Sequence, residues 1–244
     1  MLKPSILSSI PEKRSKLIER IFAKQNNQGL WKIAEPTLPL QLYLPKHTAT
    51  YHTLTILADL GCDPNDPRVE QPLQTLIHLM YNPDKGVFGI SPDAYSNHEP
   101  SPCINGHILY ILGYFGKGDI PEVISTVRHF TKYQRFDDGD FKFILLHKVC
   151  YSSHHPEQLI HKHIDELQFP GLSFLEILHS LKRAGVRDRR MERVIQLLNS
   201  KRNPDGSWNL ERPLSNSIVP FAKKGCPNEI VTERALEVLD AYNS

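Results

Sequence analysis

The sequence lacks the features that most directly indicate a membrane, a nucleic acid or a disulfide framework. Its four cysteines form no Cys-x-x-Cys pair, and we expect a reduced, cytoplasmic protein. No apolar run approaches the length of a membrane span, and the first residues lack the long apolar core of a signal peptide. The formal net charge is only +2, so composition indicates no nucleic-acid partner and no charged membrane surface as partner.

Sustained alternation of apolar and polar residues, which would indicate strands, is also absent. Apolar residues recur instead at helical spacing, and 40% of the chain is hydrophobic, enough for a sizeable core. We therefore expect one all-α domain across residues 1–244, in which Pro72 either begins or kinks its helix. The expected helices span residues 11–24, 48–60, 67–80, 103–115, 120–133, 171–184, 188–200 and 229–242.

A short motif recurs along the chain: a polar run, a glycine, one further residue, and then Trp or Phe. The copies are Gly29-Leu30-Trp31, Gly86-Val87-Phe88, Gly139-Asp140-Phe141 and Gly206-Ser207-Trp208. A repeat of this kind indicates an architecture of repeated helical units. A turn needs no aromatic residue for its own sake, so we expect each ring to pack between neighbouring helix pairs and hold them together.

The expected helices alternate between two kinds. Those before each aromatic turn are amphipathic, whereas those after the long loops are more apolar, and residues 103–115 (CINGHILYILGYF) carry no charged side chain. A helix that is apolar all round is buried on all sides. The simplest arrangement is an α/α barrel, toroid-like or incomplete, of about four helical hairpins, with amphipathic helices outside and apolar helices inside.

The turn QNNQGLW between paired helices, with its later copies, resembles the repeat of squalene and oxidosqualene cyclases. The same helical-pair repeat builds the β-subunits of protein prenyltransferases. The segments LADLGCDPNDPRVEQPLQTLIHLMYNPDKGVFG, PCINGHILYILGYFGKGD and LKRAGVRDRRMERVIQLLNSKRNPDGSWNLE are similar to small prokaryotic proteins with this repeat. The resemblance covers nearly the whole chain. It implies an α/α toroid and a hydrophobic, isoprenoid-like ligand in a central pocket.

The chain departs from these families where their chemistry resides. The DxDD acid motif of class II terpene cyclases is absent, and so is the DDxxD motif that binds magnesium–diphosphate. Prenyltransferase β-subunits hold zinc with an Asp-x-Cys pair and a distant histidine, whereas Ser101 stands two residues before Cys103 here. The chain also supplies fewer hairpins than a full toroid of these families. The barrel is therefore smaller, open, or completed by a second chain in a homo-oligomer.

Cys103 and His107 are the candidate catalytic residues. Cys103 begins an expected helix, where the positive end of the helix dipole favours a thiolate. His107 follows four residues later, on the same helical face. A Cys-x3-His pair suits a nucleophile with its base, and it also suits a metal ion. The alternative is that Cys103 is a small packing residue of the interior.

Residues around this pair complete the candidate site. Glycine inside a helix is unfavourable, so Asn105-Gly106 indicates close packing or room for a ligand. Cys226 lies before the last expected helix, at a place that we take as equivalent to that of Cys103. The candidate ligand-binding residues are Asn105, His98, Glu99 and Cys226. The candidate metal centre is a zinc ion held by Cys103, His107, Cys150 and His154.

Two kinds of function follow from this pattern. In the first, the apolar inner helices line a pocket for a hydrophobic small molecule, and any chemistry occurs at its rim. In the second, the inner helices form a filled core, and the protein is a non-catalytic scaffold that binds another protein. A cavity with polar and apolar lining favours the first, and an exposed apolar edge favours the second.

Overall fold

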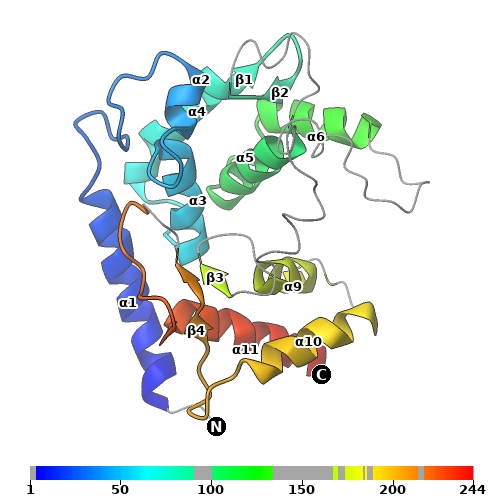
Figure 1. The fold of residues 1–244 in the computed structure, drawn as a ribbon. Coiled ribbons are helices and arrows are strands. Elements are labelled where there is room, and N and C mark those ends of the chain that lie inside the picture. The colour runs from blue at the N-terminus through cyan, green and yellow to red at the C-terminus, as the bar shows by residue number, and fades with distance from the viewer. Residues whose placement is uncertain are drawn as a thin grey trace. The chain divides into compact units, whose positions relative to one another are not determined.

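The computed structural model describes residues 4–90, 101–133, 167–169, 174–183, 185, 189–213 and 217–243. The protein is mainly helical, as expected (Figure 1). It forms two compact units: residues 1–17 and 157–244 make up unit 1, and residues 18–156 make up unit 2. The single domain across residues 1–244 stays a prediction.

All the helices expected from the sequence are present, and all but the first lie within a few residues of their expected ends. The first helix begins at Pro4, well before the expected start at residue 11. The first helix, α1 (Pro4–Phe22), contributes to both units. Unit 2 also contains α2 (Pro39–Tyr43), α3 (Thr50–Leu60), η1 (Pro67–Val69), α4 (Glu70–Met80), α5 (Pro102–Tyr114) and α6 (Pro121–Tyr133). Unit 1 contains α9 (Phe174–Arg183), η3 (Arg189–Met191), α10 (Glu192–Ser200) and α11 (Glu229–Asn243). Within the described ranges, no helix has the length and apolarity that a membrane crossing requires.

The strands are two residues long and belong to turns and loops. Strand β1 (Tyr81–Asn82) pairs antiparallel with β2 (Val87–Phe88) around one aromatic turn. Strand β4 (Asn209–Leu210) pairs antiparallel with β6 (Cys226–Pro227), and β3 (Gln168–Phe169) pairs parallel with β5 (Arg212–Pro213). These short pairs fix the paths of loops and leave the mainly helical character of the fold unchanged.

Local sequence signals account for the helix ends. Asp66 caps the short helix before α4, because its carboxylate accepts a 2.9 Å hydrogen bond from the backbone N–H of Arg68. Pro72 is the third residue of α4, where its missing N–H breaks no helical hydrogen bond. The helix therefore begins at Glu70, close to Pro72, which is the first of the two alternatives. Gly61 ends α3 in the left-handed conformation, with φ of 76°.

Three of the aromatic turns are described, and all three rings are buried. Trp31, Phe88 and Trp208 each have 0% relative exposure. The indole Nε1 of Trp31 donates to the carbonyl oxygen of Ile21 at 2.9 Å, and that of Trp208 donates to Leu198 O at 2.7 Å. Both rings are thus tied to the helix before their turn, as expected. The fourth ring, Phe141, lies outside the described residues.

Each of these turns is also bound to the helix that follows it. One polar side chain near the start of that helix accepts a hydrogen bond from the backbone N–H of the aromatic residue; we call it the clamp residue. The clamp residues are Thr50 for Trp31 (3.1 Å), Asn105 for Phe88 (2.9 Å) and Thr232 for Trp208 (2.9 Å). All three clamps are buried, so these bonds satisfy backbone groups that water cannot reach. Each clamp therefore holds its aromatic turn to a following helix, and the packing of the rings between neighbouring helix pairs stays a prediction.

Helices α3 and α5 of unit 2 run in the same general direction, and so do α9 and α11 of unit 1, as the order of their contacts shows. In unit 2, partners advance in the same direction along α3 and α5: Tyr51 with His107, Asp59 with Tyr110, and Cys62 with Tyr114. In unit 1, they advance likewise along α9 and α11: Glu176 with Arg234, and His179 with Glu237.

The first and last helices of the chain meet within unit 1. Lys13 of α1 forms an ion pair with Glu229 at the start of α11, and Arg14 forms one with Glu233. The two acidic residues lie about one helical turn apart on α11.

Candidate functional site

The clamps define which way each inner helix faces. A clamp side chain points at the aromatic turn, and a residue two positions later points roughly 200° away from it on a helix of 3.6 residues per turn. That residue is His52 on α3, His107 on α5 and Arg234 on α11. One position of the repeat thus places a nitrogen-bearing side chain on the helix side opposite the turn.

Helix α5 has an open side there, which corrects the expectation that this uncharged helix is buried all round. The exposed residues of this side are Gly106, His107 and Gly113. Two tyrosines of the same side, Tyr110 and Tyr114, are partly exposed. These residues follow the helical period and form one stripe. A Cβ atom added at Gly106 or Gly113 would meet nothing within 4 Å in the described structure. Close packing therefore does not explain these glycines, whereas open space does.

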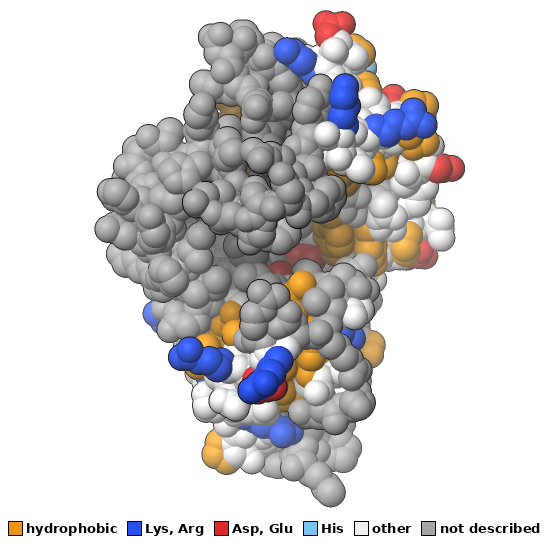
Figure 2. All heavy atoms as spheres, turned by 90° about the vertical axis from the view of Figure 1, so that its right-hand side faces the viewer, with side chains coloured by type: hydrophobic (Ala, Val, Ile, Leu, Met, Phe, Trp, Pro, Cys, Tyr) orange, Lys and Arg blue, Asp and Glu red, His pale blue; other side chains and the backbone are white. Residues whose placement is uncertain are grey.

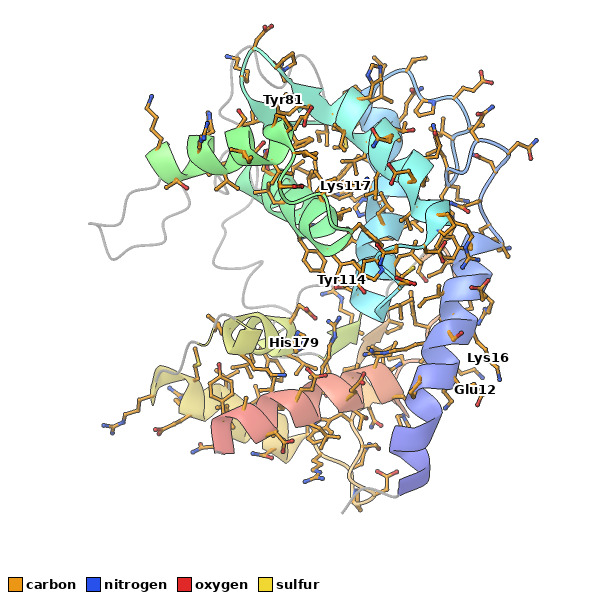
Figure 3. All side chains as sticks on the ribbon, turned by 180° about the vertical axis from the view of Figure 1, so that it is seen from behind. Glu12, Lys16, Tyr81, Tyr114, Lys117 and His179 are labelled. Atoms are coloured by element: carbon orange, nitrogen blue, oxygen red, sulfur yellow. The ribbon has the colours of Figure 1, made fainter. Side chains whose placement is uncertain are left out.

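Helix α3 extends this open side. We use the name α3–α5 face for His52, Asp59, Gly106, His107, Tyr110, Gly113 and Tyr114. The hydroxyl of Tyr110 donates to Asp59 Oδ1 at 2.9 Å, and that of Tyr114 donates to the carbonyl oxygen of Cys62 at 2.7 Å. Tyr114 is the last residue of α5, and Lys117 follows shortly after the helix ends (Figure 3). Tyr110 is thereby anchored to α3, and Tyr114 to the segment just beyond the end of α3.

Aromatic rings continue the face toward α2. The ring of Tyr51 stacks on that of His107 at 6.3 Å between centroids, and it meets His52 edge-on at 4.9 Å. The ring centroid of His52 lies 4.8 Å from that of Tyr43 of α2 and 5.3 Å from that of His47. Residues from three chain segments therefore build one aromatic cluster at the starts of the inner helices.

The histidines of this cluster are held neutral. Burial lowers the pKa of His52 to about 3, helped by the nearby His47, His107 and Lys46, and opposed by a hydrogen bond to the backbone of Tyr43. Although His107 is exposed, desolvation by the groups packed around its ring lowers the pKa of its imidazole, and the carboxylate of Asp59 acts in the opposite direction. At neutral pH these imidazoles are hydrogen-bonding groups without charge.

Unit 1 presents a charged counterpart on its inner helices. Arg234, which is 6% exposed, pairs with Glu176 of α9. Glu237, one turn later on α11, lies 3.0 Å from both His179 Nε2 and Lys182 Nζ. His179 extends from α9 (Figure 3). These polar groups satisfy one another across the helix pair.

The structure separates the predicted site residues. His107 lies on the α3–α5 face, whereas Asn105 points the other way. The Asn105 Oδ1 accepts from Phe88 N, and its Nδ2 donates to Phe88 O and Ser101 O, each bond being 2.9 Å long. Asn105 thus has a structural role, and its role in ligand binding stays a prediction. Cys103 occupies the first turn of α5, as expected, and its side chain lies outside the described set.

Cys226 does not occupy the place of Cys103 in its repeat. It is an exposed free thiol in β6, six residues before the clamp Thr232, whereas Cys103 precedes the clamp Asn105 by two. The loop between β6 and α11 therefore breaks the equivalence that helix starts alone indicated. The other predicted residues, His98, Glu99, Cys150 and His154, lie outside the described residues.

A zinc centre made of Cys103, His107, Cys150 and His154 stays a prediction for the same reason. Within the described ranges, no three His, Cys, Asp or Glu side chains are grouped closely enough to hold a metal ion. The rings of Tyr43 and His47 pack against that of His52.

Sequence reasoning missed His52, Asp59 and Tyr110. The signal was available. When the clamps Thr50 and Asn105 are aligned, His52 and His107 fall at the same position, and Asp59 follows His52 by about two helical turns. No family model matches the chain, and no curated protein or solved structure matches it either.

Proposed function

We propose that this chain is an α/α-barrel protein related to the terpenoid cyclases and prenyltransferase β-subunits, and that it binds a hydrophobic, isoprenoid-like molecule on its α3–α5 face. Parallel inner helices and clamped aromatic turns support the barrel. The isoprenoid character follows from the resemblance of the repeats. A cytoplasmic location and a zinc cofactor remain predictions of the sequence.

The observation that carries the proposal is the open stripe of α5. Each helix-interior glycine costs about 1 kcal/mol relative to alanine. Gly106 and Gly113 lower helix stability by this amount at positions where an added Cβ atom would meet nothing within 4 Å in the described structure. Tyrosine and histidine rings flank both positions. Ligand sites for apolar molecules combine such aromatic surfaces with a few oriented polar groups.

Binding rather than proton transfer is the chemistry that this face supports. A cyclase-type reaction needs a strong acid, whereas His52 and His107 are neutral and poor proton donors at neutral pH. A nucleophile–base role for Cys103 and His107 stays a prediction, because it depends on the position of the Cys103 thiol.

Farnesol, an uncharged isoprenoid alcohol, tests the proposal in calorimetric titrations of the full chain. Gly106→Leu fills the open stripe and should weaken farnesol binding at least tenfold. Leu197→Ala, on an exposed position of α10 in unit 1, is the control and should bind as the wild type does. Equal farnesol affinity in wild type and Gly106→Leu, or no farnesol binding to the wild type, would contradict the proposal.

A scaffold function is the second candidate, because α2 exposes large apolar side chains. Leu38, Leu40 and Leu44 have relative exposures of 51%, 41% and 40%. On the face drawn in Figure 2, hydrophobic side chains also reach the surface beside Lys and Arg side chains. Exposed apolar surface of this kind favours protein contacts. Self-association measured by sedimentation should fall in a Leu38→Ser/Leu40→Ser variant if α2 mediates a homo-oligomer.

A further inference from the structure

We propose that α2 and the loop after it, residues 39–47, cover the aromatic cluster of the α3–α5 face, and that proton uptake by His52 separates them from α3. We call residues 39–47 the α2 segment. This inference rests on the proposed function and adds regulation of the same face. The covered rings are those of Tyr51 and His52 at the start of α3.

The α2 segment is held to unit 2 less extensively than α3 is. Leu42 is the buried residue of the five-residue helix α2, whereas Leu40 and Leu44 on either side of it are exposed. Most of α3 is buried, and its Leu54 and Leu57 have 0% exposure. Short elements with few buried apolar side chains are the first to open in a folded protein. The α2 segment can therefore separate while α3 stays in the core.

The ring of Tyr43 joins the α2 segment to α3. Its centroid lies 5.2 Å from that of Tyr51 and 4.8 Å from that of His52. Tyr51 is only 1% exposed. Separation of the α2 segment would uncover the sides of the Tyr51 and His52 rings that now face Tyr43. These aromatic surfaces would then be open to an apolar ligand of the face.

The Nε2 atom of His52 favours an uncharged ring. It is buried and has no hydrogen-bond partner in the described structure. The hydrogen bond between the His52 ring and the backbone of Tyr43 is therefore made by Nδ1, which leaves Nε2 as the unprotonated nitrogen. Proton uptake would place a charged N–H at Nε2 without an acceptor. Separation of the α2 segment removes this penalty, because it admits water.

The charges around His52 also oppose its protonation. Among the described groups, those whose charge acts on its ring are His47, His107 and Lys46, and each of them lowers its pKa. Lys46 and His47 belong to the α2 segment, and His107 comes from α5. Burial is the largest cause, and with the segment in place the pKa of His52 is lowered to about 3.

Acid therefore favours separation of the α2 segment. Tyr43 and Tyr51 are the other titratable side chains against the His52 ring, and neither changes its charge in acid. Once the segment separates, His52 is hydrated and its pKa returns toward the ordinary value of 6.5. The closed arrangement keeps its full stability above pH 6.5 and loses it progressively as the pH falls toward 3. Between pH 7 and pH 5 the equilibrium constant for opening should rise about 25-fold.

Native-state hydrogen exchange of the full chain tests this opening. The Leu44 N–H, which donates to Leu40 O at 2.8 Å, reports on α2, and the amides of α4 report on unit 2 as a whole. We expect the opening constant at Leu44 to rise about 25-fold from pH 7 to pH 5. Exchange at Leu44 should not depend on low urea concentrations, because a local opening exposes little surface. Exchange in α4 should depend on them.

Three variants connect the opening to His52 and to Tyr43. His52→Gln removes the titration, so the opening constant at Leu44 should stay within about twofold between the two pH values. His78→Gln makes the same change at an exposed position of α4 and should keep the full rise. Tyr43→Ala removes the ring that joins α2 to α3, so it should raise the opening constant at pH 7 about tenfold. This last variant tests the cover even where His52→Gln does not fold.

The outcomes separate this inference from the function on which it rests. It is overturned by a rise at Leu44 of less than about threefold, by a rise that survives His52→Gln, or by a urea dependence equal to that of α4. Farnesol should associate faster at pH 5 than at pH 7 in stopped-flow mixing, and equal rates would overturn the regulation of the face. If no farnesol binds, the proposed function fails, and hydrogen exchange still decides whether acid separates α2 from α3.

Discussion

The side-chain amide of Asn105 forms two hydrogen bonds with the backbone of Phe88. Its Oδ1 accepts from Phe88 N, its Nδ2 donates to Phe88 O, and both distances are 2.9 Å. The two residues lie on different elements, 17 positions apart. In the first and last repeats, a threonine hydroxyl makes the corresponding contact with the N–H of Trp31 or Trp208. The same kind of contact between an aromatic turn and a helix is therefore made by a threonine hydroxyl at two turns and by an asparagine amide at the third.

Loss of the two hydrogen bonds between Asn105 and Phe88 should destabilise the protein. Asn105→Ala leaves the buried N–H and carbonyl of Phe88 without these partners, so we expect the free energy of unfolding to fall by about 1–3 kcal/mol. Asn105→Thr supplies the clamp of the other repeats and should restore part of the loss. Urea denaturation measures both values. A threonine variant no more stable than the alanine variant would show that the clamps are not interchangeable.

The two threonine clamps should stabilise different units. Thr50→Val and Thr232→Val each remove one hydroxyl at nearly constant volume and should each cost about 1–2 kcal/mol. Hydrogen exchange should accelerate in residues 18–133 for Thr50→Val, and in residues 189–243 for Thr232→Val. The same pattern of acceleration in both variants would contradict independent clamping of the units described here.

Helices and junctions were predictable because their signals are local. Asp66, Gly61 and the Gly-x-aromatic turns each mark a boundary through the chemistry of one residue. The repeat of Trp31 and Trp208 predicted rings that join helix pairs, and the structure confirms their burial. Local signals of this kind survive in a single sequence.

The face of α5 was not predictable from composition. A helix without charged residues is predicted to be buried on all sides, yet Gly106, His107 and Gly113 of α5 are exposed. Which side of a helix is open depends on what packs against it, and that is fixed by the tertiary arrangement. The clamp residue supplies the missing direction, because it identifies the side that faces the turn. The equivalence of Cys103 and Cys226 failed for a similar reason, since loop lengths differ between repeats.

Alanine at the open glycines should stabilise the protein. Gly106→Ala and Gly113→Ala add a Cβ where the described structure has nothing within 4 Å, so each should raise the free energy of unfolding by about 0.5–1 kcal/mol. Gly86→Ala is the contrasting case, because its φ is +68° and a Cβ would lie 2.5 Å from Ser125 Oγ. That variant should lose stability. Thermal unfolding monitored by circular dichroism measures all three, and destabilisation by Gly106→Ala would refute open space at this position.

His52 should make the protein sensitive to mild acid. Its folded pKa is lowered to about 3, chiefly by burial, while the unfolded chain takes up a proton near the ordinary value of 6.5. Stability therefore falls as the pH drops below 6.5, and the loss grows until about pH 3. Between pH 7 and pH 5 this one group should cost about 2 kcal/mol. His52→Gln removes the titration, so its unfolding free energy should fall less over this interval by about that amount. Above pH 7.5 the two proteins should show the same pH dependence. Equal losses in both between pH 7 and pH 5, measured by urea denaturation, would show that His52 takes up its proton in the folded state.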